Sequence, residues 1–283
     1  WNIWPGNFPI CIKSAEGATL QDIDGNNYVD FCLGDTAAMG GHTPSAALEA
    51  ISQSFHKGSA FMLPTEDHLW VAEELKRRFG LSYWQFALSS SDANRFAIRW
   101  ARLATKRKKV LIFNHAYHGS VDETLAQLDM YGQVVPKEGN IGFGTEMGET
   151  TKVVEFNDLN GVRDALSPGD VAIFLIEPVL TNVSIVRPER GFIKAVCDLC
   201  KENGTICLID ETHTISEGIG GYSGVNHISP DIIVIGKPIG SGVPAAAYGF
   251  SEELALKISN NYPDPNEVDS LGIGTTLTAS ALT

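Results

Sequence analysis

The sequence predicts an α/β fold in which a mostly parallel sheet is sandwiched by helices. Three short apolar runs carry this prediction, at residues 172–176 (AIFLI), 206–209 (ICLI) and 232–235 (IIVI). They are continuous rather than alternating, as expected of strands that are covered on both faces. Between them lie segments in which apolar residues recur every three or four positions, which is the period of a helix. Strands that alternate with helices in this way are typical of βαβ units.

The N-terminal part of the chain predicts a small separate element. From residue 18 to residue 31, apolar and polar positions alternate on either side of the sequence DGNN at 24–27, which indicates a β-hairpin with a glycine turn. We expect residues 1–45 to form an N-terminal α+β arm that is part of a small domain. Residues 46–283 are then expected to form one large domain.

The expected elements of the large domain follow in order. Two amphipathic helices come first, at residues 45–55 and 66–79. After them we expect a strand at 84–88, a helix at 92–105, strands at 110–113 and 171–179, a helix at 190–203, and strands at 206–209 and 232–235. The glycine-rich and proline-rich stretches 132–148 and 236–244 are interpreted as loops over a site rather than as linkers.

Composition excludes several classes of function. The chain has 283 residues, and its 21 basic and 34 acidic side chains give a formal charge of −13, which makes nucleic acids and anionic membranes poor partners. No apolar run approaches the roughly 18 residues that a membrane span requires. The five cysteines form no disulfide framework, so we expect a reducing, cytoplasmic location. Cys197 and Cys200 lie in a predicted helix without a second pair, and we interpret them as core residues rather than as metal ligands.

Three predicted strands end in ionisable residues, namely Glu177, Asp210 and, one residue further on, Lys237. Ligands of open α/β sheets bind beyond the carboxyl ends of the strands, so we expect these side chains to converge at one edge. Each residue taken alone could be an ordinary cap or loop residue, but the combination indicates a site. An amine there suits Schiff-base chemistry, because a desolvated lysine loses its proton more easily and becomes nucleophilic.

A run of three serines, Ser89 to Ser91, lies between a predicted strand and the helix at 92–105. Free backbone N–H groups at a helix N-terminus, with hydroxyls beside them, can hold a phosphate, although an ordinary serine cap is the alternative. A nucleotide site is disfavoured. The sequence GKP at 236–238 lacks the Ser or Thr of a P-loop, and no G-x-G-x-x-G occurs in the chain.

Five short motifs occur in a fixed order along the chain. They are LSSSDAN at 88–94, AYHG at 116–119, IEPV at 176–179, LIDE at 208–211 and GKPIGSGVP at 236–244. In order and spacing this series resembles the class III aminotransferases, nearest to their glutamate-1-semialdehyde aminomutase-like branch. The resemblance implies the large domain of a fold-type I enzyme that depends on pyridoxal 5′-phosphate (PLP). By comparison with that family, the C-terminal small domain is expected to be missing.

The resemblance also assigns roles to matching positions. Lys237 would hold the cofactor as a Schiff base and move the proton during catalysis, and Asp210 would pair with the pyridine nitrogen. The other cofactor-binding positions would be Ser90 and Ser91 at the phosphate, Tyr117 on the ring face, Glu177 and His213 near the ring, and Thr276, which would reach the phosphate of a neighbouring subunit. The last position implies a homodimer with shared active sites.

Three departures from the family pattern matter. Ser89-Ser90-Ser91 replaces the usual Ser-Gly-Thr, yet serines still donate backbone N–H groups. Thr212 and His213 replace valine and then glutamine or methionine. We expect His213 to orient the ring through its phenolic oxygen, with acid–base catalysis as the alternative. The aminomutases carry Ser-Trp in the segment aligned with residues 34–35, and the missing tryptophan argues against that particular reaction.

These observations predict a PLP-dependent aminotransferase that moves an amino group between an amine or amino acid and a keto acid through Lys237. An aminomutase, a racemase or a decarboxylase on the same scaffold remains open. The chain begins with Trp1 and no signal pattern follows, so we expect a fragment. The hypothesis from another class is a PLP-binding or partner-binding protein without turnover. An α/β domain with a structural lysine would require five motifs to agree by accident.

Overall fold

A seven-stranded sheet forms the centre of the computed structural model, which describes residues 10–144, 146–263, 271–278 and 280–282. The strand order is β4-β12-β11-β10-β9-β5-β8. The strands are β4 (Tyr83–Ala87), β5 (Lys109–Phe113), β8 (Thr151–Val154), β9 (Val171–Ile176), β10 (Ile206–Asp210), β11 (Ile232–Ile235) and β12 (Ala246–Phe250). Only β12 pairs antiparallel, with β11 and with β4, among these strands. The predicted mostly parallel α/β sheet is confirmed.

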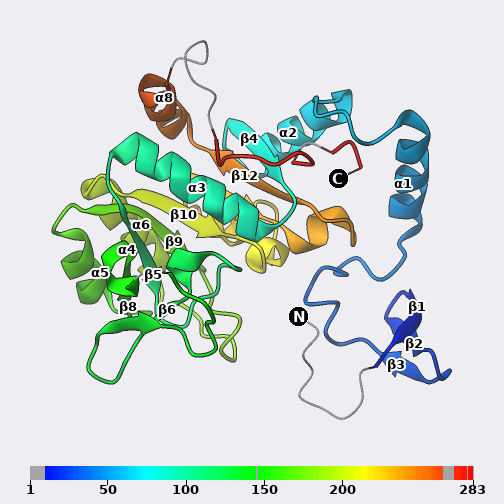
Figure 1. The fold of residues 1–283 in the computed structure, drawn as a ribbon, viewed down its shortest axis with the longest axis horizontal. Coiled ribbons are helices and arrows are strands. Elements are labelled where there is room, and N and C mark those ends of the chain that lie inside the picture. The colour runs from blue at the N-terminus through cyan, green and yellow to red at the C-terminus, as the bar shows by residue number, and fades with distance from the viewer. Residues whose placement is uncertain (1–9, 145, 264–270, 279, 283) are drawn as a thin grey trace.

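Helices cover both faces of this sheet, as Figure 1 shows. Helices α3 (Ser90–Thr105) and α8 (Glu252–Asn261) pack on one face, while α5 (Leu159–Leu166) and α6 (Phe192–Glu202) pack on the other. Successive residues of β9 point to opposite faces, so that Leu175 joins the α3 side of the core and Ile176 the α6 side. Both are fully buried, and each such side chain contributes about 1.5–3 kcal/mol relative to exposure.

Helix α3 is the element that presents the serine run to the site. It begins where the Ser89 hydroxyl accepts a hydrogen bond from the Asp92 amide, and it ends at Thr105, because the next residue, Lys106, has a φ of +59° outside the helical region. The buried face of α3 carries Ala93, Ala97 and Ala101, so the helix axis can lie close to the sheet. The position of the α3 N-terminus is therefore fixed by the core.

The N-terminal element is a separate antiparallel sheet of β1 (Ile12–Glu16), β2 (Thr19–Asp22) and β3 (Asn27–Val29). The predicted hairpin is confirmed, and the Asp22 carboxylate holds its turn by accepting from the amides of Asp24 and Asn26. In Figure 1 this sheet lies well apart from the seven-stranded sheet. Helices α1 (Ser45–Lys57) and α2 (Glu66–Phe79) follow it. The domain division at residue 45 stays a prediction.

The elements that the sequence did not predict are mainly short or peripheral. Besides β1, β8, α5, β12 and α8, they are β6 (Ala126–Leu128), β7 (Val134–Pro136), α4 (Met147–Thr150), α7 (Gly221–Val225) and the 3₁₀ turns η1 (Asp122–Thr124), η2 (Thr214–Glu217) and η3 (Lys237–Gly240). The strand predicted at 171–179 ends at Ile176, since the chain turns at Glu177-Pro178 and proline cannot donate to a ladder. No helix in the described ranges is long and apolar enough to cross a membrane.

Candidate active site

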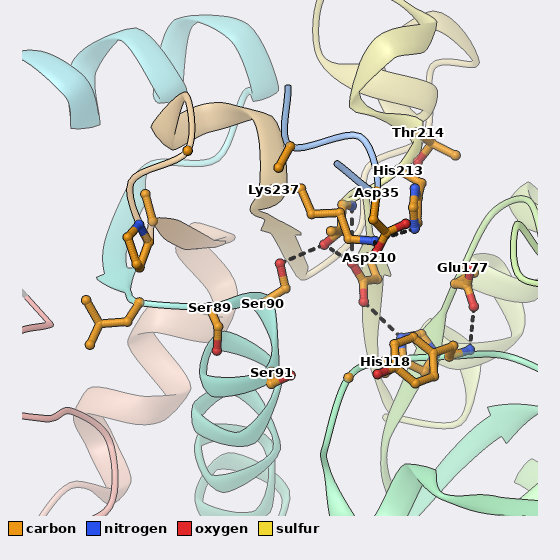
Figure 2. A pocket seen from close by; sticks show the side chains of 18 of the residues that line it. Asp35, Ser89, Ser90, Ser91, His118, Glu177, Asp210, His213, Thr214 and Lys237 are labelled. Carbon is orange, nitrogen blue, oxygen red and sulfur yellow. Dashed lines mark hydrogen bonds and ion pairs between the residues drawn. The ribbon is translucent and has the colours of Figure 1, made fainter. Parts of the chain in front are cut away.

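A cavity of about 340 Å³ opens beyond the carboxyl ends of β9, β10 and β11. Glu177, Asp210 and Lys237 line it, together with Ser90 and Ser91 at the start of α3 (Figure 2). The predicted convergence of two carboxylates and one amine at a single sheet edge is therefore confirmed. The volume lies in the range of about 300–1,000 Å³ that small-molecule sites occupy.

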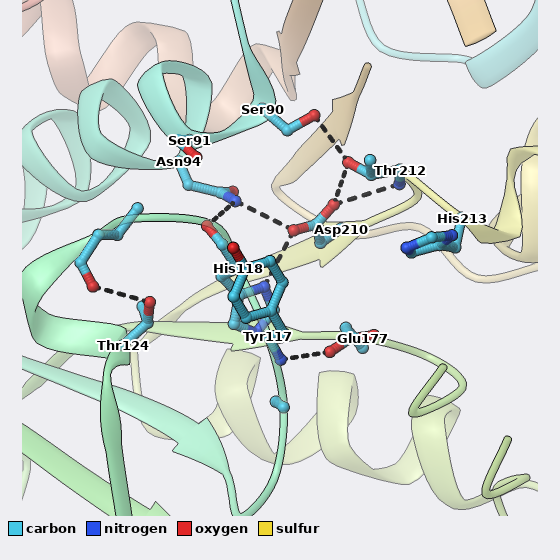
Figure 3. Close-up of polar contacts among 12 residues, drawn as sticks. Ser90, Ser91, Asn94, Tyr117, His118, Thr124, Glu177, Asp210, Thr212 and His213 are labelled. Atoms are coloured by element: carbon cyan, nitrogen blue, oxygen red, sulfur yellow. Dashed lines mark hydrogen bonds and ion pairs between the residues drawn. The ribbon is translucent and has the colours of Figure 1, made fainter. Parts of the chain in front are cut away.

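Asp210 lies on the floor of the cavity and is held by four hydrogen bonds (Figure 3). Its Oδ2 accepts from Asn94 Nδ2 at 3.0 Å and pairs with His118 Nδ1 at 2.9 Å, while Oδ1 accepts from the amide and hydroxyl of Thr212. Burial opposes ionisation, but the bonds from His118, Thr212 and Asn94 outweigh it and hold the pKa of Asp210 below its usual value. The floor thus carries a fixed negative charge.

Glu177 is the second buried carboxyl, and its pKa shifts the other way. Burial, together with the charge of Asp210, raises the pKa of Glu177 despite opposing contributions from His118 and the Tyr117 amide. Its Oε1 accepts from the Tyr117 amide, and Oε2 accepts from the Thr181 hydroxyl at 3.2 Å. Glu177 therefore fixes the loop that carries Tyr117 rather than pointing freely into the cavity.

The α3 N-terminus forms a tight concave surface with two glycines. A Cβ on Gly119 would lie 1.9 Å from Ser91 Oγ, and one on Gly236 would lie 2.0 Å from Ser90 Oγ, so neither position has room for a side chain. The first N–H groups of a helix have no partner within it, and they carry the positive end of the helix dipole. This concave surface has the donors that bind a phosphate.

Lys237 follows β11 in a strained backbone conformation. Its φ of +48° lies in the left-handed region, which costs a non-glycine residue about 1–2 kcal/mol. The amine lies 2.9 Å from Asp35 Oδ2 and 2.6 Å from His213 Nε2 (Figure 2). Burial first, and then the charge of Lys237, lower the pKa of His213, so that imidazole is neutral at pH 7.

The structure brings seven of the eight predicted site residues to this cavity, namely Ser90, Ser91, Tyr117, Glu177, Asp210, His213 and Lys237. Thr276 is exposed and does not line it. Because Thr276 was predicted to act at a neighbouring subunit, that role stays a prediction, as do the individual roles of the other seven.

Sequence reasoning assigned no role to several residues that build the site. Asn94 lies four positions after Ser90, and the helical period places both on one face of α3, so spacing could have found it. His118 was quoted within a motif, yet its bond to Asp210 joins residues 92 positions apart. Asp35 and Thr36 reach the site from a loop, and no local pattern signals their contacts with Lys237 and His213.

The donor set fits PLP. The α3 N-terminus suits the phosphate, the ionised Asp210 suits a protonated ring nitrogen, and the Lys237 amine suits an aldehyde. His118 also lines the cavity, and its buried Nε2 has no hydrogen-bond partner within the described residues. Because the His118 side chain is fully buried, this nitrogen is an unsatisfied group behind the cavity wall rather than a ligand contact.

Comparisons with known proteins agree with this chemistry. The family model "Aminotransferase class-III" matches residues 2–280. A glutamate-1-semialdehyde 2,1-aminomutase of Roseiflexus castenholzii is 34% identical over 253 residues, which cover 88% of this chain and 58% of that protein. The chain spans about 60% of the length of the curated relatives that it matches.

Solved structures match this chain over almost its whole length. A glutamate-1-semialdehyde aminomutase from Pseudomonas aeruginosa superimposes with a TM-score of 0.94 at 46% identity, over 99% of this chain and 62% of that one. A variant of that enzyme was solved in complex with PMP. An omega-transaminase from Sphaerobacter thermophilus gives a TM-score of 0.86 at 27% identity, over 99% and 67% of the two chains. The chain belongs to the class III aminotransferase family of PLP-dependent enzymes.

Proposed function

We propose that this protein moves an amino group between an amine or amino acid and a keto acid, with Lys237 as the lysine that holds PLP. One observation carries the proposal. A lysine amine, an ionised carboxylate and a helix N-terminus meet in a single cavity of about 340 Å³. Each group matches one functional part of the cofactor, and a site with fewer of them would suit many other ligands.

PLP, when bound, supplies an aldehyde for amines and a ring that withdraws electrons from the substrate carbon. In the proposed mechanism, Asp210 would hold a proton on the ring nitrogen, because its own pKa is held low. The backbone amides of Ser90 and Ser91 would hold the phosphate. Glu177 fixes the Tyr117 backbone, and Tyr117 would contact the ring. Lys237 Nζ would take and return the proton of the substrate carbon.

An aminomutase is the second candidate, and the names of relatives favour it. Proteins that are 34% and 46% identical to this chain are called glutamate-1-semialdehyde aminomutases, whereas the omega-transaminase is 27% identical. The residue at position 35 supports intermolecular transfer instead, because Asp35 stands in the segment where the aminomutases carry tryptophan. The two candidates share all the groups described above and differ in whether the amino group leaves the substrate skeleton.

Two measurements test this proposal. The first is the absorbance of the purified full-length protein with added PLP, beside Lys237→Ala and the surface control Lys194→Ala. A Schiff-base band in the parent and the control, absent in Lys237→Ala, is expected, and no band in the parent overturns both candidates.

The second measurement is product analysis. Intermolecular transfer predicts an amino product only when a keto acid is supplied. Formation of the 1-amino isomer from glutamate-1-semialdehyde alone, with no keto acid, overturns the aminotransferase in favour of the aminomutase.

We also propose a homodimer. No residue of α1 or α2 is buried, yet both helices expose large apolar side chains, including Leu48, Phe55, Leu69 and Trp70. Large exposed apolar side chains that recur on two successive helices favour an interaction site, and a second copy would also bring Thr276 to a cavity that is not its own. Sedimentation of the full-length protein tests this, and a monomer at micromolar concentration overturns it. The cytoplasmic location stays a prediction.

A further inference from the structure

Four consecutive residues adopt the left-handed conformation in a loop whose Asp35 lines the cavity. Leu33, Gly34, Asp35 and Thr36 have φ values of +56°, +56°, +57° and +69°, and the Thr36 amide donates to the Cys32 carbonyl at 3.3 Å. Three of the four are not glycine, at a cost of about 1–2 kcal/mol each. Strain of this kind persists only where the surrounding structure imposes it, and it clusters at functional sites.

Two residues of this left-handed turn, Asp35 and Thr36, contact the side chains of Lys237 and His213, whose nitrogen atoms lie close together. Asp35 Oδ2 lies 2.9 Å from Lys237 Nζ, and Thr36 Oγ1 lies 3.4 Å from His213 Nδ1. Between them, His213 Nε2 lies 2.6 Å from Lys237 Nζ. The four side chains form one continuous row, although Asp35 and Lys237 are 202 positions apart in the chain.

The hydrogen bonds of this row determine which ring nitrogen of His213 carries the proton. An ammonium has donors and no acceptor, so His213 Nε2 must accept from Lys237 Nζ. The proton of the neutral imidazole is then on Nδ1, which donates to Thr36 Oγ1. The charged groups that face His213 are Lys237 after β11, Asp35 in the turn and Asp210 at the end of β10. The charges of Asp35 and Asp210 favour an imidazolium here and partly offset burial and the charge of Lys237, which together lower the pKa of His213.

We propose that His213 is the proton acceptor that converts Lys237 into a neutral nucleophile, and that Thr36 is the positioning residue for its imidazole. One N–H bond of the ammonium breaks, a new N–H bond forms at His213 Nε2, and the electron pair left on Nζ becomes free to attack a carbonyl carbon. Charge and atoms balance within the pair, and the reverse step restores the ammonium. This inference rests on the proposed function, since it concerns the same lysine.

Kinetics of cofactor uptake can isolate this step. Full-length apo protein is mixed with PLP in a stopped-flow instrument, and the Schiff-base band is followed between pH 6 and 9. His213→Gln keeps a hydrogen-bond acceptor but cannot take the proton, so we expect its rate to fall by about 100-fold, the lower end of general-base effects. The final amplitude and the PLP dissociation constant should stay close to those of the parent. His227→Gln, on the exposed surface, is the matched control.

Three further observations make the test decisive. Added imidazole should accelerate His213→Ala in proportion to its neutral form, which a merely structural histidine would not show. Without any cofactor, mass spectrometry should find slower acylation of Lys237 in His213→Gln than in the parent. Thr36→Val, which keeps the side-chain shape, should slow band formation by a smaller factor than His213→Gln.

A normal rate in His213→Gln at every pH overturns the inference while leaving the proposed function intact. Absence of rescue by imidazole, with the band still formed slowly, also overturns it, because His213 would then act only by orienting its neighbours. A parent protein that forms no band overturns the proposed function itself.

Discussion

The floor and the rim of the cavity are built on different principles. On the floor, Asp210, Asn94 and His118 are at most 6% exposed and are held by hydrogen bonds between a strand, a helix and a loop. At the rim, the Asp35 side chain is 67% exposed, and both it and Lys237 have left-handed backbones. We infer that substitutions of floor residues change the free energy of unfolding. Rim residues instead contribute to the chemistry, and their backbone is strained.

The largest effect is expected at the rim, from Lys237→Ala. Loss of the amine removes both the cofactor bond and the proton carrier, so activity should fall by about 10⁴-fold or more, the upper end of acid–base effects. The thermal midpoint of the apo protein should change little, because alanine keeps the Cβ and its left-handed strain, and the amine that is lost has only polar contacts at its tip. Steady-state assays and calorimetry measure the two quantities. A midpoint lower by many degrees would remove the distinction between rim and floor.

The next largest effect is expected on the floor, from Asp210→Asn. Asp210 accepts hydrogen bonds at both of its oxygens, and the NH₂ group of asparagine cannot accept. At least one buried donor is therefore left unpaired, at a cost of about 1–3 kcal/mol. The matched change at the rim is Asp35→Asn. It should cost less than about 0.5 kcal/mol, since exposed ion pairs contribute little. Urea unfolding of the two apo variants measures the difference, and equal losses would contradict it.

The sequence predicted the parts of the site that follow from strand ends and missed those that depend on tertiary contacts. Continuous apolar runs end in Glu177 and Asp210, and parallel strands place such ends at one edge, so these two carboxyls followed from local patterns, whereas Asn94 and His118 of the floor did not. Strand β12 was missed because residues 245–249 are small apart from Tyr248 and resemble a loop after Pro244. The Asp35–Lys237 and Thr36–His213 contacts were missed because they depend on how a left-handed turn folds back across the chain.

A smaller effect should appear in the pH dependence of stability at Glu177. Its folded pKa is raised above the ordinary value of 4.5, so folding favours the protonated form. The stabilisation from this group is therefore fully present below pH 4.5 and is lost as pH rises through the folded pKa. Relative to Glu177→Gln, which does not titrate, the parent should gain stability as pH falls from 8 to 5. Urea unfolding at several pH values measures this gain.

The carboxyl on the floor provides the contrast. The folded pKa of Asp210 is lowered below 3.8, so its contribution is present above pH 3.8 and is lost only as pH falls through the folded value. Over pH 8 to 5, the difference between the parent and Asp210→Asn should therefore stay constant. A difference that varied for Asp210 and stayed flat for Glu177 would contradict both pKa directions.

The smallest effect tests the strain at the rim directly, by comparing Leu33→Gly with Leu33→Ala. Both variants lose the same leucine side chain beyond Cβ, so the packing loss is nearly shared, and their difference isolates the backbone. In ordinary helix or strand, glycine is less stable than alanine by about 0.5–1 kcal/mol. At the φ of +56° of Leu33 the order should reverse, because alanine there retains the clash of its Cβ. Hydrogen exchange of the amides in residues 33–38 reports local stability even where global unfolding does not. Slower exchange in Leu33→Gly than in Leu33→Ala is expected, whereas the ordinary order would mean that the left-handed turn stores no strain and that Asp35 and Thr36 reach Lys237 and His213 without cost.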